Sequence, residues 1–320
     1  MPLDLTVVLT TRRRSVGLAE TLASFRRLHV VGLRWEVLVV DNSDGDPATH
    51  AVVEKLGGDL PLRLLVEPRR GTNHGRNRAV EEARSPFLVF TDDDVEPDAA
   101  WLAELCAGAA RWPDARVFGG RVLPRWPADV AAPPPHSLFE NAYAIADWAQ
   151  PEGPYSAHRV FGPNMAYRAS VFEEGWRFDP RFGPDGSDTY VTGSETNLNL
   201  ALERAGTVPV YLPAAVVHHR VRREQLAPAW LYRRAFRLGR WEAHLAGVSG
   251  RPPGALSGLL RDLRRAYARF VVARLRRDRA GALEAGLVYW HARGTLHQWR
   301  RGLPAAPRGA QPSAGGTSVR

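Results

Sequence analysis

The sequence predicts an α/β fold, in which a mostly parallel sheet carries helices on both faces. Short apolar runs rich in β-branched residues alternate with stretches of helical spacing in the N-terminal part of the chain. The runs are continuously apolar, which is typical of strands buried on both faces. Alternation with helices favours parallel pairing, because parallel strands need a long crossover connection.

Each element in this part follows from a local pattern. The expected strands cover residues 5–9, 35–40, 62–66 and 86–90. Leu18, Leu22 and Phe25 recur at helical spacing between the first two strands. Thr72 or Asn73 can cap a helix that runs to about residue 84.

The rest of the chain is less regular until its last third. A helical pattern covers about 195–205, and residues 208–221 predict one or two strands broken at Pro213. Three helical stretches follow, at about 226–246, 255–278 and 280–300. From about residue 303 the chain is rich in Pro, Ala, Gly and Ser, which predicts a disordered tail over 303–320.

Composition excludes several classes of protein. The 320 residues are 44% hydrophobic and 24% charged, which is ordinary globular composition. The single cysteine, Cys106, excludes an intramolecular disulfide framework and a multi-cysteine zinc site. The first residues lack a secretion signal, and no apolar run is long enough to span a bilayer. We therefore expect a cytoplasmic protein.

The net charge of +9 is unevenly distributed. Residues 1–220 hold 29 acidic and 23 basic side chains, whereas residues 221–320 hold 5 and 20. An acidic first part and a strongly basic second part predict different partners for the two.

Asp92, Asp93 and Asp94 directly follow the fourth expected strand. Three adjacent carboxylates repel one another, and a divalent cation with a preference for oxygen ligands, Mg²⁺ or Mn²⁺, relieves that repulsion. The alternative is an acidic turn before a helix. Asp41 ends the second expected strand, so the acidic residues should share the edge of the sheet where ligands bind.

These motifs and those that follow resemble the family 2 glycosyltransferases, which are inverting enzymes with a GT-A type fold and nucleotide-sugar donors. The matching blocks occur in the expected order over about two-thirds of the chain, at residues 6–14, 36–43, 71–77, 87–97, 162–168, 177–180, 193–196 and 211–219. The resemblance implies a metal-binding D-x-D motif in the block that contains the aspartate triplet.

The resemblance implies a donor site for a nucleotide-diphosphate sugar, with a UDP-sugar as the first expectation. Asp41 would contact the nucleobase, although an Asx-turn would explain it too. Thr11 and Arg14 would contact the nucleoside, with Arg12 and Arg13 expected to be surface charges. Arg76 would bind phosphate near a helix N-terminus, the alternative being a solvated first-turn arginine.

The resemblance also implies a metal site that involves the triplet. Asp92 and Asp93 would contact the nucleotide, and Asp92, Asp94 and His219 would bind Mn²⁺ or Mg²⁺. His218 and His219 point to opposite sides of a strand, so only one can face the metal, and the family pattern selects His219.

Glu195 is the expected catalytic base, which removes the proton of the acceptor hydroxyl. The family usually has Glu-Asp at this position, whereas this chain has Ser194-Glu195. The carboxylate is retained with one extra methylene, which changes its reach. The alternative is a glutamate in the first turn of a helix, stabilised by the helix dipole.

Asn164 and Trp176 lie where the family builds its acceptor side. Trp176 could stack on a sugar, and a core position would explain it equally well.

The C-terminal third predicts a basic amphipathic helix at about 256–277. Peripheral attachment to an anionic inner leaflet and packing of a helical annex with a solvated basic face both explain it. Nucleic-acid binding is the least favoured reading, since no RNA-binding motif occurs.

We therefore expect a metal-dependent inverting glycosyltransferase that acts on the hydroxyl of a lipid-linked, saccharide or small-molecule acceptor. Its catalytic domain would span 1–221, with a nucleotide-sugar half at about 1–123 and an acceptor half at about 124–221, before a basic helical region at 222–302. The alternatives are a nucleotidyltransferase and a transferase-fold binding protein with impaired catalysis.

Overall fold

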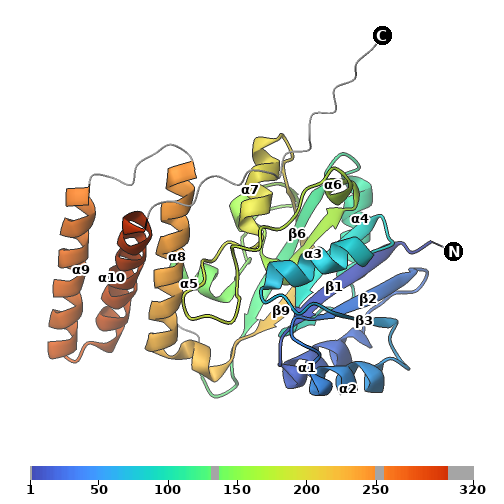
Figure 1. The fold of residues 1–320 in the computed structure, drawn as a ribbon, viewed down its shortest axis with the longest axis horizontal. Coiled ribbons are helices and arrows are strands. Elements are labelled where there is room, and N and C mark those ends of the chain that lie inside the picture. The colour runs from blue at the N-terminus through green and yellow to red at the C-terminus, as the bar shows by residue number, and fades with distance from the viewer. Residues whose placement is uncertain (1, 131–136, 249–255, 302–320) are drawn as a thin grey trace, which may run out of the picture.

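A computed structural model describes residues 2–130, 137–248 and 256–301 of the chain. The predicted tail at 303–320 lies outside these residues. The core of the molecule is a nine-stranded mixed sheet with helices packed around it (Figure 1). Eight strands follow the order β3-β2-β1-β4-β8-β6-β9-β5, and β7 pairs with β9.

The strands are β1 (Leu5–Thr11), β2 (Trp35–Asp41), β3 (Leu62–Val66), β4 (Phe87–Asp92), β5 (Val95–Pro97), β6 (Val117–Arg125), β7 (Gly153–Pro154), β8 (Met165–Arg168) and β9 (Val210–Arg220). The helices are α1 (Ser15–Phe25), α2 (Pro47–Leu56), α3 (Thr72–Glu82), α4 (Trp101–Arg111), α5 (Ser137–Tyr143), α6 (Ser170–Glu173), α7 (Thr196–Arg204), α8 (Pro228–Val248), α9 (Leu256–Leu275) and α10 (Arg279–Arg300). Short 3₁₀ turns occur at η1 (Ala157–Arg159), η2 (Gly162–Asn164) and η3 (Arg223–Leu226).

The four strands predicted in the N-terminal part form one parallel block. β1 pairs with β2 and β4, and β2 pairs with β3, all in parallel. Successive β1 residues alternate between two cores: Val7 packs with α1, α2 and α4, whereas Val8 packs with α3, α6 and α7. Both faces are therefore buried, which is why the strand sequences are continuously apolar.

The other half of the sheet departs from the predicted parallel pattern. β8 is antiparallel to both β4 and β6, and β5 is antiparallel to β9. Of the one or two strands expected over 208–221, the structure has one, because β9 continues through Pro213; its pairing with β6 is nevertheless interrupted between Leu212 and Val216. The register against β6 shifts at Gly120/Arg121, and this irregularity accommodates the proline.

The start of α3 also differs from the prediction. Gly71, with φ of 133°, occupies the N-cap, and neither Thr72 nor Asn73 caps the helix with its side chain. The Asn73 amide instead donates to the carbonyls of Asp179, Phe182 and Ser194. Through these three hydrogen bonds, Asn73 connects α3 to the segment that precedes α7.

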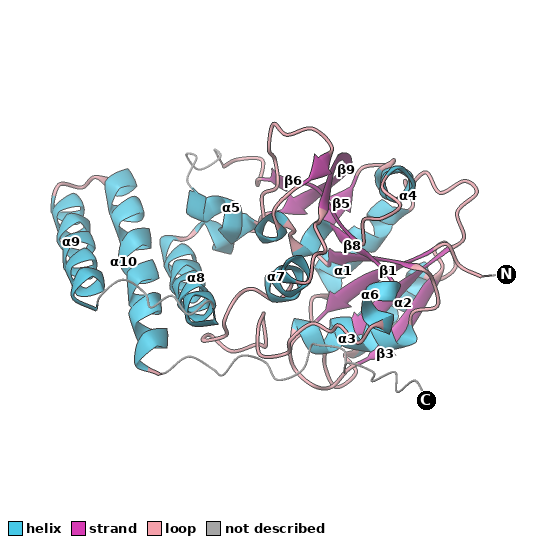
Figure 2. Cartoon of the chain, turned by 90° about the horizontal axis from the view of Figure 1, so that it is seen from above, coloured by secondary structure: helices cyan, strands magenta, loops and turns pink. Residues whose placement is uncertain are grey.

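The three predicted C-terminal helices form as expected. α10 packs between α8 and α9, and α8 lies nearest to the sheet (Figures 1 and 2). Phe139 and Tyr143 of α5 share a hydrophobic cluster with Leu231, Ala235 and Leu287 of α8 and α10. This cluster joins the helical region to the α/β part. Among the described residues, no helix is sufficiently long and apolar to cross a membrane.

Candidate active site

A cavity of about 440 Å³ lies at the carboxyl ends of the parallel strands. Its walls come from the ends of β1, β4 and β9, from α3, from the segment before α7 and from α8. Five arginines and four carboxylates line it, namely Arg12, Arg14, Arg76, Arg222, Arg234, Asp92, Asp93, Asp94 and Glu195. Dense charge of both signs in one hollow suits a polyanionic ligand.

The aspartate triplet is held by its neighbours. Asp93 accepts a hydrogen bond from the Thr11 hydroxyl at 2.6 Å and pairs with Arg14 at 2.6 Å. Asp94 pairs through Oδ2 with Arg14 at 2.7 Å and with Arg222 at 3.1 Å. Burial raises the pKa of Asp93 to about 7 against the charge of Arg14. Burial also opposes ionisation of Asp94, but His219 and Arg14 outweigh it and lower its pKa.

His219 faces this cavity, whereas His218 points away and lies 3.0 Å from Asp98. The Nδ1 atom of His219 is 2.7 Å from the Tyr143 carbonyl. A carbonyl can only accept, so Nδ1 carries a proton and directs the other nitrogen toward Asp94. His219 Nε2 and Asp94 Oδ1 are 3.5 Å apart. Both atoms are acceptors, so they attract each other only when a proton or a cation lies between them.

The donor set in this corner fits a divalent cation in its chemistry. Asp94 Oδ1 and His219 Nε2 face one another, and the Asp92 side chain, 32% exposed, lines the same cavity. Among the described residues, however, no group of three or more His, Cys, Asp or Glu side chains is gathered in a metal-binding arrangement. Asp92 instead lies 3.8 Å from the Arg76 guanidinium.

Glu195 occupies the N-cap position of α7, at the rim of the cavity. Its Oε1 accepts from the Gly162 amide at 3.1 Å, and its Oε2 contacts the Ser194 hydroxyl and lies 3.5 Å from Arg76. Burial opposes ionisation, but the Arg76 charge and these hydrogen bonds outweigh it and hold the pKa of Glu195 below its ordinary value. The carboxylate is therefore ionised at neutral pH.

Arg76 is 4% exposed and joins two of the predicted site residues. Its Nη1 lies 3.5 Å from Glu195, and its Nη2 lies 3.8 Å from Asp92. The guanidinium also lies over the Phe178 ring, 5.5 Å from its centroid. A solvated first-turn arginine is therefore the wrong interpretation of this residue.

Asp41 is fully buried in this structure. Its carboxylate accepts from the Ser43 hydroxyl and from the Asp46 amide, both at 2.6 Å. These contacts are the turn interactions considered as the alternative. Contact with a nucleobase stays a prediction for Asp41, and the neighbouring Asn42 lines the cavity.

Asn164 and Trp176 hold structural positions. Asn164 is fully buried, donates to the carbonyls of Arg121 and Ala215, and accepts from the Trp101 indole at 2.9 Å. Trp176 is 7% exposed and belongs to the hydrophobic core between α3, α6 and α7. Neither lines a described cavity. Asn164 is therefore held by internal hydrogen bonds, and Trp176 takes the core position that was the alternative to stacking on a sugar. A role for either residue on the acceptor side stays a prediction.

Sequence reasoning missed three arginines of the cavity. Arg12, interpreted as a surface charge, lines the cavity, and its buried Nε has no hydrogen-bond partner within the described residues. Arg222 and Arg234 follow β9 and were assigned to the basic C-terminal region. Arg222 lies only three residues after His219 in the sequence, and this proximity could have indicated that Arg222 lies at the same site. No sequence pattern distinguishes Arg234 from the other arginines of the C-terminal third.

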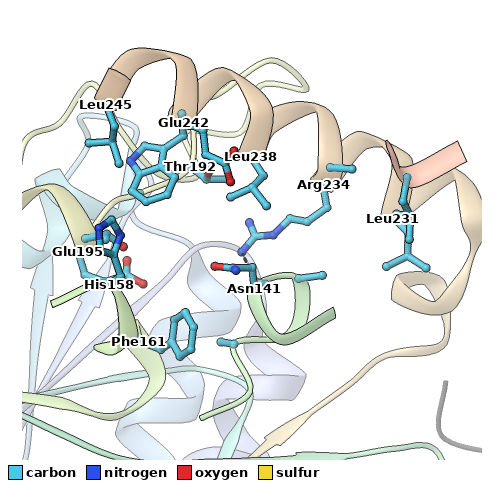
Figure 3. Close-up of a pocket in the computed structure, with 17 residues that line it drawn as sticks. Asn141, His158, Phe161, Thr192, Glu195, Leu231, Arg234, Leu238, Glu242 and Leu245 are labelled. Carbon is cyan, nitrogen blue, oxygen red and sulfur yellow. Dashed lines mark hydrogen bonds between the residues drawn. The ribbon is translucent and has the colours of Figure 1, made fainter. Parts of the chain in front are cut away.

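A second cavity of about 390 Å³ adjoins the first. Figure 3 shows Arg234, Leu238 and Leu245 projecting from α8 into the space that Glu195, His158 and Asn141 face, with Leu231 farther along the helix. Glu195, Thr192, Gly193 and Arg234 line both cavities, so they mark the junction between them.

A sheet whose parallel strands end at such a cavity has the GT-A architecture of glycosyltransferases. Residues 6–176 match the family described as Glycosyl transferase family 2, and the chain belongs to this family. The resemblance seen in the sequence is thereby confirmed, and the protein is an enzyme of the glycosyltransferase class.

Two relatives illustrate the range of the family. The succinoglycan biosynthesis protein ExoM of Rhizobium meliloti is 29% identical over 243 residues, which cover 72% of each chain. The glucosyl-dolichyl phosphate glucuronosyltransferase of Haloferax volcanii is 25% identical over 63% of this chain and 64% of its own.

Solved structures confirm the fold. The Pyrobaculum calidifontis mannosyltransferase PcManGT, in complex with GDP-Man and Mn²⁺, superposes with a TM-score of 0.63 at 18% identity. That match covers 94% of this chain and 89% of the mannosyltransferase. Residues 1–349 of S. aureus TarS, in complex with UDP-GlcNAc, superpose with a TM-score of 0.53 at 14% identity, over 95% and 93% of the two chains.

Proposed function

We propose that this enzyme transfers a sugar from a nucleotide-diphosphate donor to an acceptor hydroxyl, with inversion and with the help of a divalent cation. The observation that supports the proposal most strongly is the position of Arg76 between Glu195 and Asp92. One guanidinium thus separates an ionised carboxylate from the acidic triplet. A base on one side and a leaving-group site on the other suit a single displacement.

In this mechanism Glu195 accepts the proton of the acceptor hydroxyl as its oxygen attacks the anomeric carbon. The Gly162 amide and Arg76 orient the carboxylate and keep it ionised. Arg12 and Arg222 line the cavity near the triplet and are suited to hold the diphosphate. Ser194-Glu195 retains the carboxylate that catalysis needs, which disfavours an impaired binding protein.

The residues that would hold the cation are Asp94 and His219, with Asp92 on the same cavity wall. When bound, the cation would act as a Lewis acid that stabilises the charge of the departing diphosphate. The relative in complex with Mn²⁺ and GDP-Man supports this role, as does the family pattern. UDP-sugars and GDP-sugars are the donors to test first, since solved relatives hold one or the other.

Peripheral attachment to a membrane is a further part of the proposal. α9 exposes several arginines beside the exposed apolar side chains Tyr267, Val272 and Leu275. A helix with this mixture suits the interface of an anionic bilayer.

Replacement of Glu195 by Gln tests the catalytic assignment. We expect release of nucleotide from UDP-glucose, UDP-N-acetylglucosamine or GDP-mannose to fall by about 10²–10⁴-fold, because a general base contributes that much. Nucleotide binding, measured by calorimetry, should stay unchanged. Glu173→Gln, at an exposed position on α6, is the matched control. Near-normal turnover in Glu195→Gln would remove Glu195 as the base.

A further inference from the structure

The second cavity lies between α8 and the catalytic part of the chain. Leu231, Leu238 and Leu245 of α8 form one wall, and residues of α5, η1 and the segment before α7 form the other (Figure 3). Its volume of about 390 Å³ falls within the range of small-molecule sites. No cofactor role is expected for it in the proposed reaction, so it is available for a substrate.

Its position relative to Glu195 indicates which substrate. Glu195 lines both cavities, whereas the aspartate triplet lines only the first. The donor nucleotide belongs with the triplet and its arginines. A ligand in the second cavity would therefore approach Glu195 from the side away from the triplet, where an acceptor hydroxyl must lie for attack opposite the leaving group.

The lining of the cavity indicates the chemical class of this ligand. Its wall contains apolar side chains together with polar ones, which include Asn141, His158, Thr192 and Arg234. A pyranose ring presents apolar C–H faces and a rim of hydroxyls, and so matches a wall of both kinds. A lipid chain would instead require a continuously apolar wall.

Trp241 gives this pocket a rigid aromatic wall. The indole is 7% exposed, and its Nε1 donates to Asn197 at 3.3 Å. Gly193 allows the close approach, because a Cβ there would stand 2.0 Å from Nε1. His158 packs edge-on to the indole, with ring centroids 6.0 Å apart. Unlike Trp176, which is equally buried, Trp241 lines a cavity, so its indole adds apolar surface to the wall that a sugar would contact.

We propose that this pocket is the acceptor subsite and that it binds the terminal pyranose of a saccharide. The inference rests on the proposed function and deepens it by naming the acceptor class. It also gives α8 a role in acceptor specificity, beyond its packing against the α/β part.

Saturation-transfer NMR tests the proposal with defined probes. The panel contains the methyl pyranosides of glucose, galactose, mannose and N-acetylglucosamine, together with octyl glucoside and octyl phosphate. Each is added to the full chain with diamagnetic Mg²⁺ and with UDP or GDP. We expect saturation of the ring protons of at least one glycoside, and its loss in Leu238→Trp, because the added indole fills the pocket.

Controls separate this proposal from the proposed function. Leu245→Trp fills the same pocket from another position, and Leu263→Trp alters the separate groove between α8, α9 and α10. Nucleotide binding retained in each variant shows that the fold and donor site are intact. The acceptor subsite is supported if a filled-pocket variant still binds nucleotide but loses the glycoside signal. Leu263→Trp should keep that signal.

Three results would overturn it. The first is the absence of ring-proton signals from every glycoside in the wild-type protein while nucleotide binds. The second is a ring signal that both filled-pocket variants retain. The third is saturation confined to octyl chains, which would indicate a lipid site. Absence of nucleotide binding in the wild-type protein would instead count against the proposed function.

Discussion

Replacement of Arg76 by Met should destabilise the protein because it leaves a buried carboxylate without its counter-charge. Arg76 Nη1 lies 3.5 Å from Glu195, and the two side chains are 5% and 15% exposed. At an effective dielectric constant of about 20, this separation corresponds to about 5 kcal/mol of Coulomb attraction. The contact with Asp92 is longer, at 3.8 Å, and more exposed, so it adds less.

The desolvation of Arg76 offsets part of this attraction, and removal of one partner of a buried pair typically costs about 3–5 kcal/mol. We therefore expect Arg76→Met to lower Tm by about 10 °C in a thermal unfolding scan. The double variant Arg76→Met/Glu195→Gln should recover about 1–3 kcal/mol, since the unpaired charge is then removed as well.

The dependence on pH has a definite sign. Arg76 lowers the pKa of Glu195 from its ordinary value of 4.5, so the stabilisation is present above that value and is lost as the pH falls through the lowered pKa. In Arg76→Met, burial of Glu195 is no longer opposed by the Arg76 charge, so the pKa of Glu195 is higher than in the wild-type protein and its protonation relieves the unpaired charge. The difference in Tm between the wild-type protein and Arg76→Met should therefore narrow as the pH falls from neutral. Additivity of the two substitutions within about 0.5 kcal/mol at neutral pH would refute the coupling of Arg76 to Glu195.

Two further predictions concern the metal and the membrane. Asp94→Asn should weaken nucleotide binding in Mn²⁺ but not in EDTA, as measured by calorimetry, because it removes a charged ligand. Equal affinities in Mn²⁺ for variant and wild type would count against the metal assignment. The full chain should sediment with phosphatidylglycerol vesicles but not with phosphatidylcholine vesicles. Arg261→Glu/Arg265→Glu should abolish this binding, and retained binding would exclude the basic face of α9 as its cause.

Local pattern made the catalytic half predictable. β1, β2, β3 and β4 follow from continuous apolar runs, and α1 follows from the helical spacing of Leu18, Leu22 and Phe25. The intervening helix α2 was not predicted. The position of the acidic triplet at the carboxyl edge follows from the parallel topology alone. The alternation of side chains along a strand showed that only one of His218 and His219 can face the site, and the family resemblance then selected His219.

Contacts between distant segments could not be predicted in this way. Asn164 and Trp176 occur where the family builds its acceptor side, yet Asn164 accepts a hydrogen bond from Trp101 and Trp176 belongs to a hydrophobic core cluster. Arg234 looked like one of many basic residues in the last third, and only the packing of α8 against the site brings it to the cavity.

The sequence by itself determined the family, the parallel block of strands and the chemical character of the donor edge, because these depend on periodicity and on residues close together in the chain. Only the tertiary structure decided that Arg76 joins Glu195 to Asp92, and that α8 forms the wall of a second cavity at Glu195. Charge pairing and pocket shape depend on which surfaces meet in space, and one-dimensional spacing does not carry that information.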